Sequence, residues 1–228
     1  MSTTRLVVFD VDGTLIDSAE SIFACLCATF DVLGRPRLPR AEALAVVGLS
    51  LPEAFARLLP GAGAGEVAAA VAAYRAAFLD LRAAGRAEDA APLFPGARTL
   101  LDALLAAPGL VLGVATGKAR RGLDHALALH GLEGHFATLQ TADDHPSKPH
   151  PSMLRQALAE TGVPPGQAVM VGDTSFDMEM GRAAGLRSVG VAWGHHSDAV
   201  LTAAGADVVV ADFAALGGLL ADWRVAAP

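Results

Sequence analysis

Arg5-Leu-Val-Val-Phe-Asp-Val-Asp-Gly-Thr-Leu15 is the stretch that decides the fold, because it combines a short apolar strand with two carboxylates at a glycine turn. Residues 6–9 are apolar without interruption, as expected for a strand buried on both faces of a parallel sheet. Asp10 and Asp12 are two residues apart, so an extended backbone projects both side chains from the same side. We expect the later elements to be arranged around this pair.

Strands and helices alternate in the sequence after residue 92. Apolar strands are expected at residues 111–115, 137–141, 168–171, 188–192 and 207–210, with helical segments between them. This alternation implies right-handed crossovers and a parallel sheet with helices on both faces. The sequence therefore predicts an α/β fold with a Rossmann-like parallel sheet as its core.

The alanine-rich block from residue 18 to residue 92, called the insert below, shows helical spacing and no strand pattern. Within it Ser50-Leu-Pro-Glu53 has the form of a capping box. We predict a core domain made of residues 1–17 and 93–228, and a helical bundle of residues 18–92 that enters after the first strand. The expected helices of the bundle are residues 18–33, 40–47, 50–59 and 65–84.

Composition limits the partners and the compartment. The chain has 228 residues, 53% of them hydrophobic, which is enough for a sizeable core. A formal charge of -7 argues against a nucleic-acid surface, which needs clustered Lys and Arg. No segment reaches the roughly 18 uninterrupted apolar residues of a membrane helix, and the N-terminus lacks a signal-peptide pattern. We expect a cytoplasmic protein with no membrane or nucleic-acid partner.

Reactive residues gather where four of the expected strands end. Ligands of open parallel sheets bind beyond the carboxyl ends of the strands, so these residues are expected to meet. They are Asp10 and Asp12 after the first strand, Thr116 and Gly117 after the second, Lys148 after the third, and Asp173 and Asp177 after the fourth.

The charges of this set predict a cation. Four carboxylates face Lys148 alone, which leaves a site near -3. A hard divalent ion with oxygen ligands would offset the repulsion, and Mg²⁺ suits carboxylates, backbone carbonyls and water. With the ion in place the site can accept a phosphate, for which Thr116, Gly117 and Lys148 supply donors.

These motifs, in this order, resemble the hallmarks of the haloacid dehalogenase superfamily: Asp10-Val-Asp-Gly-Thr14, Thr116, Lys148-Pro149 and Gly172-Asp-Thr-Ser-Phe-Asp177. Softer similarities in residues 47–53, 190–194 and 204–207 point to its phosphoglycolate phosphatase type. The resemblance implies a core of that superfamily's fold and makes the insert a mobile cap. It further implies that Asp10 is the nucleophile and Asp12 the general acid and base.

The same resemblance assigns Mg²⁺ to the Asp10 carboxylate, the Asp12 backbone carbonyl and Asp173. Asp177 is expected to be a supporting ligand or to hold a ligand in place. The predicted activity is Mg²⁺-dependent hydrolysis of a small, phosphoglycolate-like phosphate monoester through an aspartyl-phosphate. The alternatives are a sugar phosphomutase or pyrophosphatase of the same superfamily and, less favoured, a non-hydrolysing phospho-acceptor module.

Three further features have competing interpretations. Lys118 is interpreted as a solvent-facing charge at a helix start. The adjacent His195 and His196 are expected at the rim of the pocket or in solvent. Asp143 is expected either to steady the metal's waters or the lysine, or to cap a helix.

Overall fold

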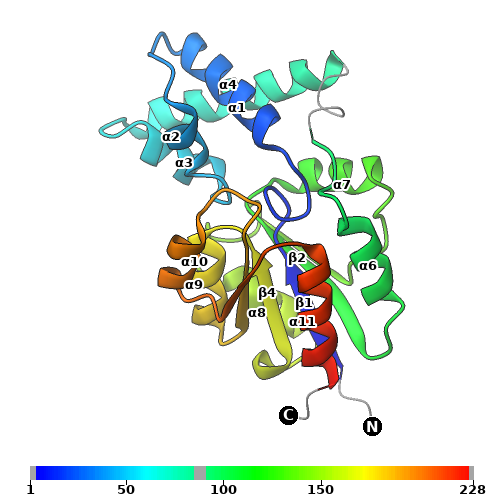
Figure 1. Ribbon diagram of the computed structural model, residues 1–228. Coiled ribbons are helices and arrows are strands. Elements are labelled where there is room, and N and C mark those ends of the chain that lie inside the picture. Colours follow the sequence, from blue (N-terminus) through cyan, green and yellow to red (C-terminus); the bar gives the residue numbers. More distant parts are fainter. Residues whose placement is uncertain (1–3, 85–90, 226–228) are drawn as a thin grey trace.

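A single parallel sheet forms the core of the computed structural model, which describes residues 4–84 and 91–225 (Figure 1). Within these residues the strand order is β3-β2-β1-β4-β5-β6, with every neighbouring pair parallel. This arrangement confirms the predicted α/β fold and places β1 between β2 and β4. The strands are β1 (Arg5–Phe9), β2 (Leu110–Thr116), β3 (Thr138–Thr141), β4 (Ala168–Gly172), β5 (Arg187–Val191) and β6 (Val208–Val210).

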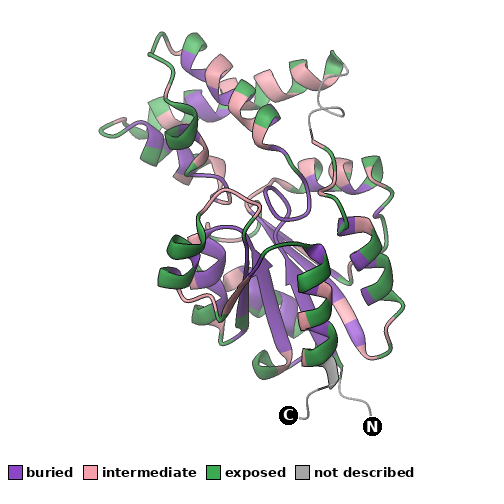
Figure 2. Cartoon of the chain, viewed as in Figure 1, coloured by how far each residue is buried: buried purple, intermediate pink, exposed green. Residues whose placement is uncertain are grey.

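Helices cover both faces of the sheet (Figure 2). The central strand β1 carries buried apolar side chains on both of its faces, so each face needs such a cover. Val7 and Phe9 pack in a cluster with apolar residues of three helices, α6 (Ala97–Leu105), α7 (Arg120–Leu129) and α11 (Phe213–Val225). Leu6 and Val8 pack on the opposite face with residues of α8 (Ser152–Thr161) and α9 (Ser175–Ala184). The period of two along β1 therefore fixes which layer each residue joins. The short helices η1 (Pro165–Gln167) and α10 (Asp198–Ala204) complete this part of the chain.

The helices of the insert, which directly follow β1, pack against one another and not on the faces of the sheet. They form an apolar cluster centred on residues such as Phe30, Phe55 and Val71. Alanine is frequent in the longest of them, in keeping with its high helix propensity. Figure 1 shows this group beyond the carboxyl edge of the sheet. Its helices are α1 (Ala19–Val32), α2 (Arg40–Leu44), α3 (Leu51–Leu58) and α4 (Ala64–Ala83).

Two chain segments join the insert to the sheet, and they run beside each other. The backbone N–H of Asp17 donates to the carbonyl of Pro92 at 2.8 Å, and that of Phe94 donates to the carbonyl of Leu15 at 3.0 Å. The ends of the insert are thus held together at one place. The predicted limits between core and insert, after residue 17 and after residue 92, fall at these hydrogen bonds, and the division into two domains stays a prediction. Where those limits reach residues 1–3, 85–90 and 226–228 they lie outside the described residues.

The capping box predicted at Ser50 does not form. Helix α3 begins after Ser50 as expected, but the Ser50 side chain makes no capping hydrogen bond. Its backbone N–H instead donates to Ser147 Oγ at 2.9 Å, and Glu53 pairs with Arg57 at 3.3 Å. The contact with the loop after β3 outcompetes the local cap, and it ties the insert to the core.

No helix among the described residues is both long enough and apolar enough to cross a membrane.

Candidate active site

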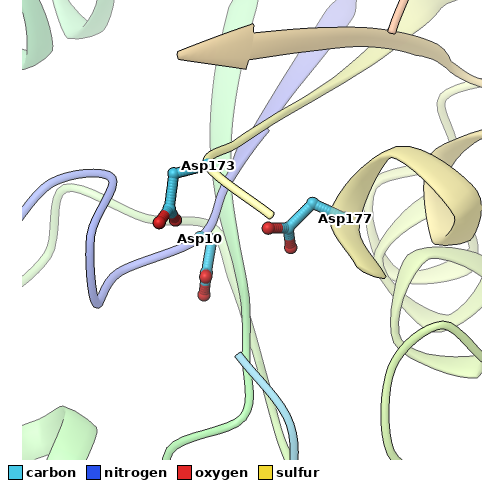
Figure 3. Close-up of side chains that lie close together, drawn as sticks. All are labelled: Asp10, Asp173 and Asp177. Atoms are coloured by element: carbon cyan, nitrogen blue, oxygen red, sulfur yellow. The ribbon is translucent and has the colours of Figure 1, made fainter. Parts of the chain in front are cut away.

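Three carboxylates converge at the carboxyl edge of the sheet (Figure 3). Asp10 follows β1, Asp173 follows β4, and Asp177 lies in the first turn of α9. One oxygen of each lies within 4.8 Å of the others, and all three residues are buried. Adjacency of β1 and β4 therefore brings together three of the residues that the sequence predicts for the site.

Lys148 lies among these carboxylates. Its Nζ is 2.8 Å from Asp10 Oδ1 and 2.7 Å from Asp177 Oδ1, and the residue is only 1% exposed. Burial by itself would lower the pKa of the Lys148 ammonium, but Asp10 and Asp177 hold it above its usual value. Lys148 is therefore a cation fixed between two acids.

The pKa of Asp10 is raised to about 8. Burial is the main cause, and the charges of Asp177 and Asp173 add to it, while Lys148 acts in the opposite direction. Asp10 Oδ2 is buried and has no hydrogen-bond partner among the described residues. Without a further positive charge, this carboxyl group tends to hold its proton.

Asp177 is fully engaged by its neighbours. Besides Lys148, its Oδ2 accepts hydrogen bonds from the Thr174 backbone N–H at 3.1 Å and from Thr174 Oγ1 at 2.6 Å. The Asp177 backbone N–H in turn donates to Thr174 Oγ1 at 3.4 Å, which completes a capping box that starts α9. The geometry therefore favours the second of the two roles predicted for Asp177, that of a residue that holds others in place.

Asp173 is held by groups from two other loops. Thr14 Oγ1 donates to Asp173 Oδ1 at 2.9 Å, and the His195 backbone N–H and Nδ1 both lie within 2.9 Å of Oδ2. Burial would raise the pKa of Asp173, but His195 and Thr14 hold it below its usual value. The backbone at residue 13 passes so close to Asp173 that only glycine fits there, since a Cβ on Gly13 would lie 2.2 Å from Asp173 Oδ2.

The prediction for His195 is wrong. Its side chain is 6% exposed and contacts Asp173, and the pKa of its imidazole is raised by that carboxylate although burial opposes the shift. His196 differs: its Nδ1 accepts from the Ser175 backbone N–H at 3.0 Å, and its Nε2 lies 3.4 Å from the Ala45 carbonyl of the insert. Asp143 accepts from the Arg120 backbone N–H at 2.8 Å, which favours the capping interpretation.

Asp12 faces a different environment from Asp10. Ser18 Oγ donates to Asp12 Oδ1 at 2.7 Å, and Lys118 Nζ lies 3.0 Å from Oδ2. The interpretation of Lys118 as a solvent-facing charge is therefore wrong, since its side chain is 18% exposed and pairs with Asp12. The site thus contains one more ammonium group than the sequence-based charge count assumed.

Thr116 and Gly117 lie where β2 ends. Thr116 is 1% exposed, and its Oγ1 accepts a hydrogen bond from the Lys118 backbone N–H at 3.2 Å. The insert comes close to Gly117, because a Cβ there would lie 2.5 Å from the Gly48 carbonyl oxygen. Thr116, Gly117, Asp10 and Asp12 all line one cavity of about 480 Å³, which opens between the sheet edge and the insert.

The carboxylates of Asp10 and Asp173, with Asp177 held beside them by Thr174 and Lys148, suit a hard divalent cation. All offer carboxylate oxygens, which Mg²⁺ and similar ions prefer. The unpartnered Asp10 Oδ2 and the raised pKa of its carboxyl group are consistent with a missing positive charge at this point. The side chains present therefore fit a divalent metal.

Comparison with known proteins places the chain in a family. Residues 7–191 match the family model described as haloacid dehalogenase-like hydrolase, so the chain belongs to the haloacid dehalogenase-like hydrolases. This confirms the resemblance based on the four motifs. The matched region covers the predicted site and the insert together.

Three curated relatives show how the similarity extends. The chain is 36% identical to "Probable phosphatase IndB" of Dickeya dadantii, over 93% of this chain and 92% of that one. It is 35% identical to "Pyrophosphatase PpaX" of Bacillus pumilus, over 84% and 85% of the two chains. It is 32% identical to "Phosphoglycolate phosphatase" of Yersinia pestis, over 93% and 91%. The similarity to the phosphoglycolate phosphatase type is therefore confirmed.

Proposed function

We propose that this chain is a Mg²⁺-dependent phosphatase that hydrolyses a small phosphate monoester through an aspartyl-phosphate on Asp10. The observation that carries the proposal is that two acids two residues apart lie in different surroundings. Asp10 lies in the buried carboxylate cluster beside Lys148, whereas Asp12 faces Ser18 and Lys118 at the cavity. The names of the relatives support the same class of reaction.

The first step is attack by an Asp10 carboxylate oxygen on phosphorus. A bond forms between that oxygen and phosphorus, the bond from phosphorus to the ester oxygen breaks, and Asp12 gives its proton to the leaving oxygen. Splitting hydrolysis into two displacements lowers the barrier of each. Lys118 and Ser18 hold Asp12 on the cavity side, where a leaving group would lie.

The second step returns both acids to their starting states. Asp12, now a carboxylate, takes a proton from water as the water oxygen bonds to phosphorus. The bond from phosphorus to Asp10 then breaks, which releases phosphate and frees the Asp10 carboxylate.

Donors at the cavity floor assist both steps. We propose that the Thr116 hydroxyl and the Gly117 backbone N–H bind the phosphoryl oxygens, since both residues line the cavity. Lys148 is buried between Asp10 and Asp177, so its proposed role is to keep Asp10 charged and to present positive charge beneath the phosphate. A bound Mg²⁺, held by Asp10, the Asp12 backbone carbonyl and Asp173, would supply the charge that neutralises an incoming phosphate.

Phosphate release from p-nitrophenyl phosphate tests the proposal. We expect turnover with Mg²⁺, loss of turnover with EDTA, and no turnover in Asp10→Asn. Asp124→Asn serves as a matched control, because Asp124 is an exposed residue of α7 that pairs with Arg120 on the surface. Near-normal turnover in Asp10→Asn would contradict the mechanism.

Pyrophosphate hydrolysis is the second candidate, because one relative carries the name pyrophosphatase. The two activities share the steps at Asp10 and differ in the leaving group, which is phosphate in place of an alcohol. Turnover of inorganic pyrophosphate at a kcat/KM above that of every monoester tested would favour it.

A further inference from the structure

The leaving group of the substrate has to extend from Asp12 into the cavity beneath the insert. The proposed function makes Asp12 the residue that protonates the leaving oxygen, and this inference rests on it. Lys118 Nζ lies 3.0 Å from Asp12 Oδ2 and 5.9 Å from the centre of the Phe78 ring on α4. Lys118 therefore lies between Asp12 and the Phe78 ring, and Phe78 also lines the cavity.

Apolar side chains of the insert form one wall of the cavity. They include Ile22 and Leu26 from α1, Phe55 from α3, and Tyr74, Phe78 and Leu79 from α4. Phe55 and Tyr74 meet edge to face, with ring centres 6.0 Å apart, which stiffens this wall. An apolar wall combined with a few polar groups is typical of sites for ligands with a sizeable apolar body.

The cavity is large for a two-carbon substrate. Its volume of about 480 Å³ corresponds to roughly sixteen water molecules, at about 30 Å³ for each. Phosphoglycolate, with about nine non-hydrogen atoms, would leave much of the apolar wall in contact with water and gain little from it.

The charged residues of the lining disfavour one class of leaving group. Arg75, Arg82 and Arg121 all line the cavity, and Arg82 lies 3.1 Å from His125 across it. Asp12 offsets the charge of Lys118, with which it pairs, and Asp10 lies at the proposed reaction centre, so Asp143 is the remaining acid that the lining sets against the three arginines. An amine-bearing leaving group would be repelled by this set, whereas a neutral or anionic one would not.

We propose that the substrate is a phosphate monoester whose alcohol is bulky, largely apolar and not cationic, and that the insert selects it by apolar contact around Phe78. Each methylene buried against this wall should raise kcat/KM. Full burial is worth about fourfold per methylene, and even partial burial gives about twofold.

A series of primary alkyl phosphates tests the proposal, because ethyl, butyl, hexyl and 2-phenylethyl phosphate have leaving alcohols of similar pKa. We expect kcat/KM to rise by at least about tenfold from ethyl to hexyl phosphate. In Phe78→Ala the hexyl-to-ethyl ratio of kcat/KM should fall severalfold. Leu105→Ala is the control, since Leu105 is an exposed apolar residue of α6 that does not line the cavity.

The outcomes separate this inference from the proposed function. Turnover of p-nitrophenyl phosphate together with a flat or falling alkyl series would overturn the inference alone. An unchanged hexyl-to-ethyl ratio in Phe78→Ala would likewise overturn the role of the apolar wall. Absence of turnover for every ester, including p-nitrophenyl phosphate, would overturn the proposed function and this inference with it.

Discussion

Replacing Lys148 by methionine should destabilise the metal-free protein by about 3–5 kcal/mol. The substitution keeps most of the side-chain volume and removes the ammonium group. In the folded chain that group is 2.8 Å from Asp10 Oδ1 and 2.7 Å from Asp177 Oδ1, and none of the three side chains is more than 1% exposed. Two buried acids thus lose their shared counter-charge.

The magnitude follows from opposing contributions. At an effective dielectric constant of about 20, each contact near 2.8 Å contributes about 6 kcal/mol of attraction. Burying the ammonium group costs several kcal/mol, which offsets part of this attraction. Asp10 limits the loss further, because its pKa is already raised to about 8 with Lys148 in place, so this carboxyl group readily stays protonated when Lys148 is removed.

The sign of the pH effect also sets the assay conditions. The pKa of Lys148 is raised in the folded state, so its stabilisation is fully present below the unfolded value of 10.5 and is lost as the pH rises through the folded value. At pH 7.5 Lys148 is charged while Asp10, with a pKa of about 8, is only partly ionised, so urea unfolding at this pH in EDTA measures the pairing of Lys148 with Asp177 and part of its pairing with Asp10.

Lys118→Met is the matched control. It removes an ammonium group from the same site, but the side chains of Lys118 and Asp12 are 18% and 12% exposed, so water compensates part of the loss. We expect a smaller cost than that of Lys148→Met. If Lys148→Met costs no more than Lys118→Met, then the buried lysine does not stabilise the carboxylate cluster, and the electrostatic reasoning fails.

Three further predictions concern catalysis and pH. Asp12→Asn should lower kcat by roughly 10²- to 10⁴-fold through loss of acid and base catalysis, and an unchanged kcat would remove Asp12 from that role. Gly117→Ala should lower kcat/KM by about tenfold or more and leave the circular dichroism spectrum unchanged, because the new Cβ would lie 2.5 Å from the Gly48 carbonyl oxygen and displace the insert. Full activity of this variant would contradict the close contact between Gly117 and the insert. Burial lowers the pKa of His130 from 6.5, so the folded state binds the proton more weakly and stability falls as the pH drops below about 6.5. Relative to His130→Gln, the wild type should therefore lose stability between pH 7.5 and 5.5 in urea unfolding, and a constant difference would exclude this effect.

Secondary structure was predictable from the sequence because its signals are local. The apolar run of β1 and the alternation after residue 92 lead directly to a parallel sheet, and observed strand ends lie within a residue or two of the expected ones. The sequence did not predict the strand order. Alternation shows that crossovers exist, but tertiary packing decides which strand becomes the neighbour of β1.

The wrong predictions at the site also arise from tertiary packing. His195 follows β5, and its ring reaches Asp173 only because β5 lies beside β4 and the loop folds back. The position of Lys118 two residues past Thr116, at a helix start, predicts a charge in solvent, yet Phe78 of the insert lies over Lys118. Ser50 had a local capping partner, but a residue 97 positions away took its N–H. Contacts between distant segments are absent from any sequence window.

The paired connections between the insert and the sheet restrict how the insert can travel. Two hydrogen bonds, Asp17 to Pro92 and Phe94 to Leu15, make the crossing a narrow two-stranded ribbon in place of two independent tethers. Such a ribbon bends more readily across its flat face than within its plane, so the insert should swing along a single arc. Lengthening one connection alone would unpair the ribbon and release sideways sliding, whereas matched changes in both would move the pivot and keep the arc.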